Sequence, residues 1–143
     1  MSVWEGWLVV AAGGAIGALG RAAIQRAVAR WLPVGSRGIP GWLAIGHATL
    51  IVNVVGSFVL GLVLAGPDGP EPLGALSAAT PLSGAKLFWS SGICGSLTTF
   101  STFAADAVGL ARRRDPLRLT VYLIANGVLC VAAIAVGVRL GSG

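Results

Sequence analysis

Four apolar stretches, each long enough to cross a lipid bilayer, limit the folds that are open to this chain. They cover about residues 8–28, 42–65, 87–111 and 119–140. About 20 apolar residues in a helix span the hydrocarbon core of a membrane. Of the 10 basic and 5 acidic residues, only Arg21, Arg26, Asp106 and, at the very end of the last stretch, Arg139 fall inside these stretches. We therefore predict an all-α integral membrane protein in which residues 1–143 form a single domain of four transmembrane helices.

The composition agrees with a membrane protein and argues against other classes. Charged residues make up 10% of the chain and the mean hydropathy is +0.85, whereas soluble domains contain about 25% charged residues. The net charge of +5 does not come from a basic run interleaved with aromatic residues, so we predict no nucleic-acid binding. His47 has no nucleophile or carboxylate at a recognisable spacing, and Cys94 and Cys130 lack metal-ligand spacing. We predict that the protein is not an enzyme.

Basic residues near the ends of the spans are divided unequally between the two sides of the membrane. Seven lie on the side of the first and third connections: Arg26, Arg30, Arg37, Arg112, Arg113, Arg114 and Arg118. Only Lys86 and Arg139 lie on the other side, together with both termini. By the positive-inside rule, both termini of this multi-pass cell-membrane protein are predicted to lie outside the cytoplasm.

The second span contains a polar pair in a stretch without formal charge. Asn53 stands near its middle, and Thr49 shares its helix face four residues earlier. An amide at this depth needs hydrogen-bond partners, and two interpretations stay open. Asn53 either joins two helices, a bond worth about 1 kcal/mol, or points its NH₂ group into a polar path; Thr49 favours the path.

The third span predicts a helix break. Residues 92–103 combine two glycines with five hydroxyl side chains at mid-membrane depth, where we expect a discontinuity near Gly95–Thr98. Non-helical backbone at that depth persists only where protein buries it or where it lines a cavity or ion site. The alternative is a continuous helix whose Ser and Thr side chains bond back to their own carbonyls. Phe100 and Phe103 share one face of this segment, as either core or path residues.

The remaining polar residues of the spans are ambiguous when taken singly. Arg21 is costly at mid-membrane and either snorkels to the interface or places a positive charge in a vestibule. Asp106, near the arginine-rich end of its span, is expected to form an ion pair. Tyr122, Asn126 and Cys130 recur every four residues on one face of the last span, as an interface or as one pore wall. An interior rich in NH and OH donors without a central acid favours an anion as the transported species.

Three segments of the sequence resemble signature segments of the Fluc (CrcB) fluoride channel family. They are Gly13-Gly14-Ala15-Ile16-Gly17-Ala18-Leu19-Gly20-Arg21, Thr49-Leu50-Ile51-Val52-Asn53-Val54-Val55-Gly56-Ser57-Phe58 and Gly92-Ile93-Cys94-Gly95-Ser96-Leu97-Thr98-Thr99-Phe100-Ser101-Thr102-Phe103. The resemblance covers three of the four spans in the right order. It departs from the family at Ser96, Asp106, Asn126 and Cys130, where the family often has glycine, glutamate and small hydroxyl residues.

This resemblance implies a passive fluoride channel that exports fluoride from the cytoplasm and confers fluoride resistance. It implies an antiparallel dimer with two pores and a structural sodium ion at the dimer centre, held by the backbone carbonyls of Gly95 and Thr98. The implied pore residues are Asn53, which donates its amide hydrogens, Phe100 and Phe103, which offer ring edges, and Tyr122, Thr49 and Ser101.

Two further questions stay open at this stage. A small four-helix multidrug-type exporter is the alternative, but such a carrier needs a carboxylate in its first span, where this chain has Arg21. A non-transporting scaffold subunit would leave Asn53 and the hydroxyl-rich break unexplained. The arginine asymmetry also leaves open whether the antiparallel dimer is a homodimer or a heterodimer with an oppositely biased homologue.

Overall fold

Four helical segments long and apolar enough to cross a membrane make up the computed structural model. The structure describes residues 2–31, 46–66 and 83–143, and in these ranges all regular secondary structure is helical. The segments are Val3–Trp31, His47–Leu64, Gly84–Arg112 and Pro116–Gly141. The predicted class, an all-α membrane protein with four transmembrane helices, is therefore confirmed.

Local capping signals place two helix starts earlier than hydropathy alone predicts. Helix α1 (Val3–Trp31) begins in a capping box: Ser2 Oγ accepts from the Glu5 N–H over 3.3 Å, and Glu5 Oε2 accepts from the Ser2 N–H over 2.7 Å. Helix α6 (Pro116–Gly141) begins with proline in its first turn, and the Asp115 side chain accepts from the Arg118 N–H over 3.1 Å. Polar residues thus extend these helices beyond their apolar stretches.

Helix α2 (His47–Leu64) begins after Gly46, which has a φ of 89°. Only glycine adopts this left-handed conformation without strain. Residues 42–45 of the predicted second span lie outside the described residues, as do most of the first two connections.

The third span is interrupted at its middle. It consists of α3 (Gly84–Leu87), a π-helical segment η2 (Phe88–Cys94), α4 (Gly95–Leu97) and, after Thr98 and Thr99, α5 (Phe100–Arg112). Thr98 and Thr99 both have extended backbone, with φ/ψ of −71°/155° and −145°/113°. The predicted discontinuity is therefore present, at the end of the expected Gly95–Thr98 segment.

Glycine pairs allow two close helix contacts. A Cβ atom on Gly13 would lie 2.5 Å from the Phe88 carbonyl oxygen, and one on Gly92 would lie 2.9 Å from Gly13 Cα, so α1 packs with its backbone against η2. Gly61 and Gly137 meet in the same way between α2 and α6. Small residues let helices approach in this manner within a membrane, where van der Waals packing drives association.

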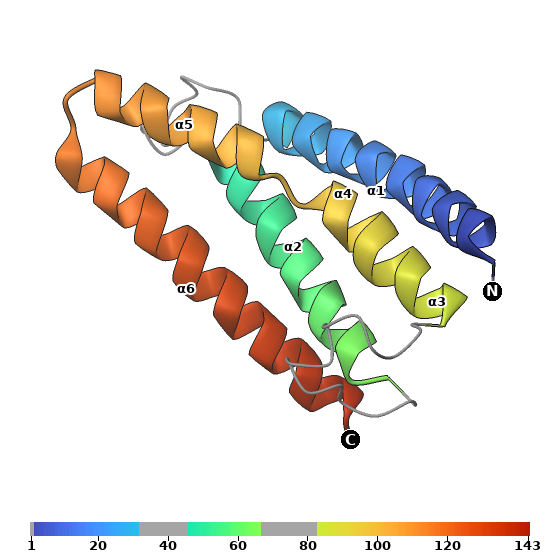
Figure 1. Ribbon diagram of the computed structural model, residues 1–143. Coiled ribbons are helices and arrows are strands. Elements are labelled where there is room, and N and C mark those ends of the chain that lie inside the picture. Colours follow the sequence, from blue (N-terminus) through green and yellow to red (C-terminus); the bar gives the residue numbers. More distant parts are fainter. Residues whose placement is uncertain (1, 32–45, 67–82) are drawn as a thin grey trace.

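The break changes the neighbours of the third span. The half before it, α3 to α4, packs against α1, whereas α5 contacts α6 after the break. Helix α2 packs most extensively against α6 and also contacts η2, and Figure 1 shows it between these two elements, with both chain termini toward the same end. The break therefore faces α2 and α6, the helices that carry Asn53 and Asn126.

Candidate functional site

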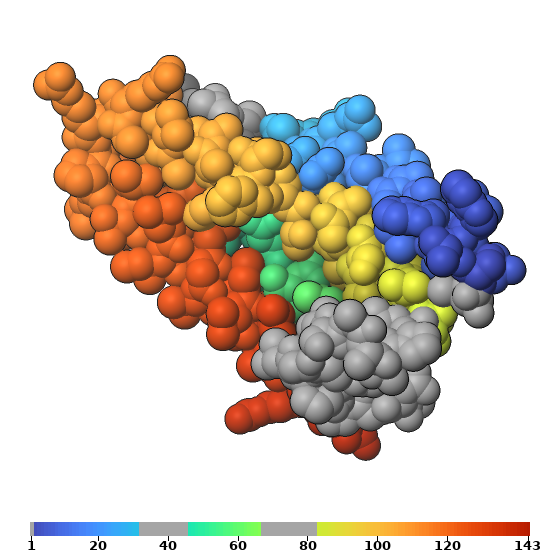
Figure 2. Space-filling view, in the orientation of Figure 1, coloured from blue at the N-terminus to red at the C-terminus, as the bar shows by residue number. Residues whose placement is uncertain are grey.

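A cavity of about 450 Å³ opens beside the break in the third span. Figure 2 shows it as a hollow in which green α2 is visible between the yellow part of the third span and orange-red α6. Helix α2, the third span and α6 all contribute to its lining. The lining residues are Asn53, Gly56, Ser57, Leu60, Ser90, Cys94, Gly95, Thr98, Thr99, Phe100, Phe103, Asn126, Gly127 and Cys130.

The side chain of Asn53 ties helix α2 to the break. Its Oδ1 accepts a hydrogen bond from the Thr99 N–H over 2.9 Å, a backbone donor that a continuous helix would use internally. Thr99 in turn caps α5, because its Oγ1 accepts from the Thr102 N–H over 3.3 Å. Two of the backbone donors displaced by the break, the N–H groups of Thr99 and Thr102, are thereby satisfied within protein, as a non-helical segment at membrane depth requires.

The same arrangement leaves several backbone carbonyls, among them those of Gly95 and Thr98, without their usual helical donors. In a continuous helix the Gly95 carbonyl would accept from the Thr99 N–H and the Thr98 carbonyl from the Thr102 N–H. These two donors bond instead to Asn53 Oδ1 and Thr99 Oγ1. The carbonyl oxygens of Gly95 and Thr98 are therefore open to another partner, and oxygen is the ligand type that hard cations prefer.

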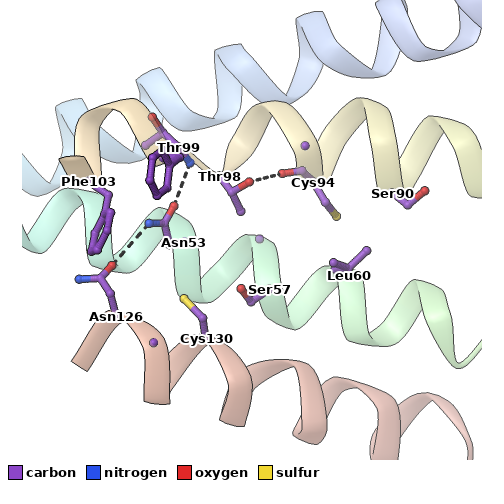
Figure 3. A pocket seen from close by; sticks show the side chains of 14 residues that line it. Asn53, Ser57, Leu60, Ser90, Cys94, Thr98, Thr99, Phe103, Asn126 and Cys130 are labelled. Carbon is purple, nitrogen blue, oxygen red and sulfur yellow. Dashed lines mark hydrogen bonds between the residues drawn. The ribbon is translucent and has the colours of Figure 1, made fainter. Parts of the chain in front are cut away.

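The NH₂ group of Asn53 points toward α6. Because Oδ1 is engaged by Thr99, Nδ2 faces Asn126 and donates to its Oδ1 over 3.4 Å, a long and weak hydrogen bond. Asn126 is oriented by its own Nδ2, which donates to the Tyr122 carbonyl over 3.0 Å. Figure 3 shows Asn53 between Thr99 and Asn126, with both hydrogen bonds as dashed lines.

Three aromatic rings follow one another beside the cavity. The ring centroids of Phe100 and Phe103 are 5.8 Å apart, and those of Phe103 and Tyr122 are 5.4 Å apart in a stacked arrangement. Phe100 is 79% exposed, so its ring lies at the open side of the cavity. The rim of an aromatic ring carries the positive end of its quadrupole, and this row can therefore present apolar but electropositive edges.

A hydroxyl–carboxylate cluster lies next to the aromatic row. Thr49 Oγ1 donates to Asp106 Oδ2 over 2.7 Å, and the Tyr122 hydroxyl donates to the same oxygen over 3.2 Å. The ion pair expected for Asp106 stays a prediction, and the interactions seen at its carboxylate are the hydrogen bonds that Oδ2 accepts from these two hydroxyls. Three helices, α2, α5 and α6, meet at this carboxylate.

The structure brings most of the predicted site residues together and separates others. Asn53, Phe100, Phe103, Gly95 and Thr98 line the cavity.

Thr49 and Tyr122 do not line the cavity but lie next to it through Asp106. Ser101 is exposed and its Oγ lies 3.3 Å from Thr99 Oγ1, outside the lining. Arg21 is half-buried on α1 and does not line the cavity either.

Several polar lining residues had no role assigned from the sequence, among them Ser57, Asn126 and Cys130. Asn126 and Cys130 belong to the polar face of α6, which the sequence left open between an interface and a pore wall. Ser57 follows Asn53 by four residues and so shares its helix face, a signal that points to the same cavity. The cavity wall of α6 thus consists of Gly127 and two of the residues that depart from the resembled family, Asn126 and Cys130.

Together these features define a small four-span membrane protein with a donor-lined cavity at a mid-span helix break. Residues 8–138 match the family described as CrcB-like protein, Camphor Resistance (CrcB). The chain belongs to this family.

Curated relatives cover nearly the whole chain. The fluoride-specific ion channel FluC of Idiomarina loihiensis is 36% identical over 133 residues, which are 93% of this chain and 89% of the relative. FluC of Aeromonas salmonicida is 38% identical over 138 residues, 94% of each chain. Fluoride-specific ion channel FluC 2 of Rhodococcus jostii is 38% identical over 135 residues, 94% of this chain and 97% of the relative. The similarity thus extends across all four spans.

Proposed function

We propose that this chain is a subunit of a fluoride-specific ion channel, not an enzyme and not a multidrug exporter. Family membership and the names of the relatives support fluoride as the transported ion. The observation that carries the proposal is the amide of Asn53, whose NH₂ group faces the cavity while its carbonyl is engaged by the Thr99 N–H. A neutral donor at this place binds an anion without a fixed charge that would trap it.

The path of the ion runs along the cavity from Asn53 past the rings of Phe100 and Phe103. Fluoride exchanges water for the Asn53 N–H groups and for electropositive ring edges, each of which is weak enough to release it. Thr49 and Tyr122 lie farther along the same path, beside Asp106. Ser101, next to Thr99, lies at its outer edge.

Passive conduction is sufficient for export and hence for fluoride resistance. Hydrogen fluoride crosses bilayers uncharged and dissociates in a more neutral cytoplasm, which leaves fluoride inside. A potential of 100 mV is worth about 2.3 kcal/mol per elementary charge and drives an anion outward from a negative interior. No coupling ion or nucleotide is needed in this scheme.

A sodium ion is the structural cofactor in this proposal. The carbonyl oxygens of Gly95 and Thr98 fit a hard cation, because their helical donors are used elsewhere. In secondary transporters, backbone carbonyls freed at a broken helix coordinate sodium in the same way. The ion would supply fixed positive charge that stabilises the break.

The functional unit is an antiparallel dimer in the cell membrane. The open side of the cavity and the exposed Phe100 ring at mid-span support a protein partner at this face. Both a homodimer and a heterodimer with a homologous subunit fit this proposal. With fixed insertion, both termini lie outside the cytoplasm.

Fluoride efflux from liposomes tests the function. Purified protein is reconstituted into vesicles loaded with potassium fluoride or potassium chloride, and valinomycin starts the flux, which ion-selective electrodes record. We expect fast fluoride efflux and chloride release no faster than from empty vesicles. Equal release of both anions, or none of either from this chain with or without a homologous subunit, would overturn the proposal.

A further inference from the structure

The NH₂ group of Asn53, the fluoride donor in the proposed function, already has a protein atom as acceptor for one of its two N–H bonds. Asn126 Oδ1 accepts the hydrogen bond from Asn53 Nδ2 over 3.4 Å, on the cavity side of the amide. Asn126 is only 5% exposed and itself lines the cavity. An unpaired amide N–H in an apolar surrounding is costly, so this acceptor stabilises Asn53 when no anion is bound.

The orientation of both amides follows from their outer partners. The Thr99 N–H is a donor, so of the two polar atoms of the Asn53 amide only Oδ1 can accept its hydrogen bond. The Tyr122 carbonyl is an acceptor, so of the two polar atoms of the Asn126 amide only Nδ2 can bond to it. If either amide group were rotated by 180°, it would lose its bond to Thr99 or to Tyr122. Two oxygen atoms or two nitrogen atoms would then face each other between Asn53 and Asn126. The carbonyl of Asn126 is thus directed at the NH₂ group of Asn53.

The bond between the two amides is the weak member of this chain of three. Its 3.4 Å length exceeds the usual range, whereas the outer bonds measure 2.9 and 3.0 Å. An anion is a stronger acceptor for an N–H than a neutral carbonyl. Fluoride can therefore displace this carbonyl, while the outer bond keeps Asn53 in place.

We propose that Asn126 Oδ1 is an internal acceptor for one of the two N–H bonds of Asn53 Nδ2, and that fluoride must displace it to engage both. This inference rests on the proposed fluoride conduction and adds a determinant of its concentration dependence. Asn126 acts through Asn53 and is a positioning residue. Its competition with the ion weakens fluoride binding and speeds release.

The test measures initial fluoride efflux at a series of fluoride concentrations. In Asn126→Ala the competitor is absent, so the half-saturating concentration should fall by about threefold, as expected for a weak hydrogen bond, and the maximal rate should fall with slower release. Asn126→Ser provides a second variant, because its hydroxyl can bond back to the Tyr122 carbonyl; the same shift is expected. Leu129→Ala, which removes a 44% exposed side chain from α6, should change neither value.

A fall in the half-saturating concentration together with a fall in the maximal rate separates this role from a structural one. A merely damaged cavity would raise the half-saturating concentration or leave it unchanged while the rate falls, and that result in the folded variants overturns the inference. Efflux by the unmodified protein decides the proposed function separately. If the unmodified protein conducts and the variants show no downward shift, only the role of Asn126 is refuted.

Discussion

The hydroxyl of Thr49 donates a 2.7 Å hydrogen bond to Asp106, a residue 57 positions away in the sequence. Tyr122 donates to the same carboxylate oxygen, so a charged group inside the third span is held by two neutral donors. The carboxylate is placed on α5 beside the aromatic row, where a freely exposed negative charge would repel an anion. The dipoles of the two hydroxyls reduce the negative potential that the carboxylate exerts beside the aromatic row.

Thr49→Val removes one of these donors and keeps the shape of the side chain. We expect fluoride efflux to fall by about tenfold, because a hydrogen bond to a charged group contributes about 1.5–3 kcal/mol and its loss leaves more negative charge beside the path. Thr120→Val, on an exposed face of α6, serves as the matched control. Efflux from Thr49→Val equal to that of the control would show that this hydroxyl does not affect the path.

Asn53→Asp should abolish fluoride efflux. A carboxylate repels the anion and offers no N–H to it, although one oxygen could still accept from Thr99. The measurement is electrode-recorded efflux from liposomes, with size-exclusion chromatography to verify that the variant is folded. A folded Asn53→Asp protein that conducts like the unmodified one is incompatible with the role proposed for this amide.

Phe100→Ile and Phe103→Ile test whether ring edges or only bulk matter. Isoleucine remains apolar but has no quadrupole, so efflux should fall in both variants while the protein remains folded. Val108→Ile, at a 52% exposed position of α5, controls for the presence of a new isoleucine on this helix. Normal efflux from both phenylalanine variants would show that the apolar bulk of these side chains is sufficient and that their ring edges play no part.

Gly137→Ala should weaken the contact between α2 and α6. A Cβ atom there would collide with the Phe58 carbonyl oxygen, so the helices must separate, and such overpacking costs about 1–3 kcal/mol. Gly109→Ala is the matched control, because a Cβ on Gly109 meets nothing within 4 Å. We expect thermal unfolding in detergent at a lower temperature only for Gly137→Ala; equal temperatures for both would contradict this close contact.

Reporter fusions at Gly143 test the orientation of the chain. The seven-to-two division of basic residues predicts that most copies insert with Arg112–Arg114 in the cytoplasm and the C-terminus outside. Such a fixed orientation favours an antiparallel heterodimer with an oppositely biased homologue. Equal cytoplasmic and external signals, or robust efflux from liposomes that hold this chain alone, would instead support a homodimer.

Hydropathy and local chemistry determined the outline of the fold. The four spans follow from apolar stretches that only a membrane accommodates, and the break follows from glycine and hydroxyl residues between Gly92 and Phe103. Both are properties of short windows of sequence. The caps at Ser2 and Asp115 are equally local, but hydropathy does not register them, and two helices therefore begin earlier than predicted.

The direction of the Asn53 amide was decided only by tertiary structure. Its partners, Thr99 and Asn126, lie 46 and 73 residues away, and the sequence left open whether the amide joins helices or faces a path. It does both, because one end of the amide accepts from the break and the other faces the cavity. Ser101 belongs to the same hydroxyl run as Thr98 and Thr99 yet lies outside the lining. A helix face becomes a cavity wall only through the helices that pack opposite it, and no window of sequence contains that information.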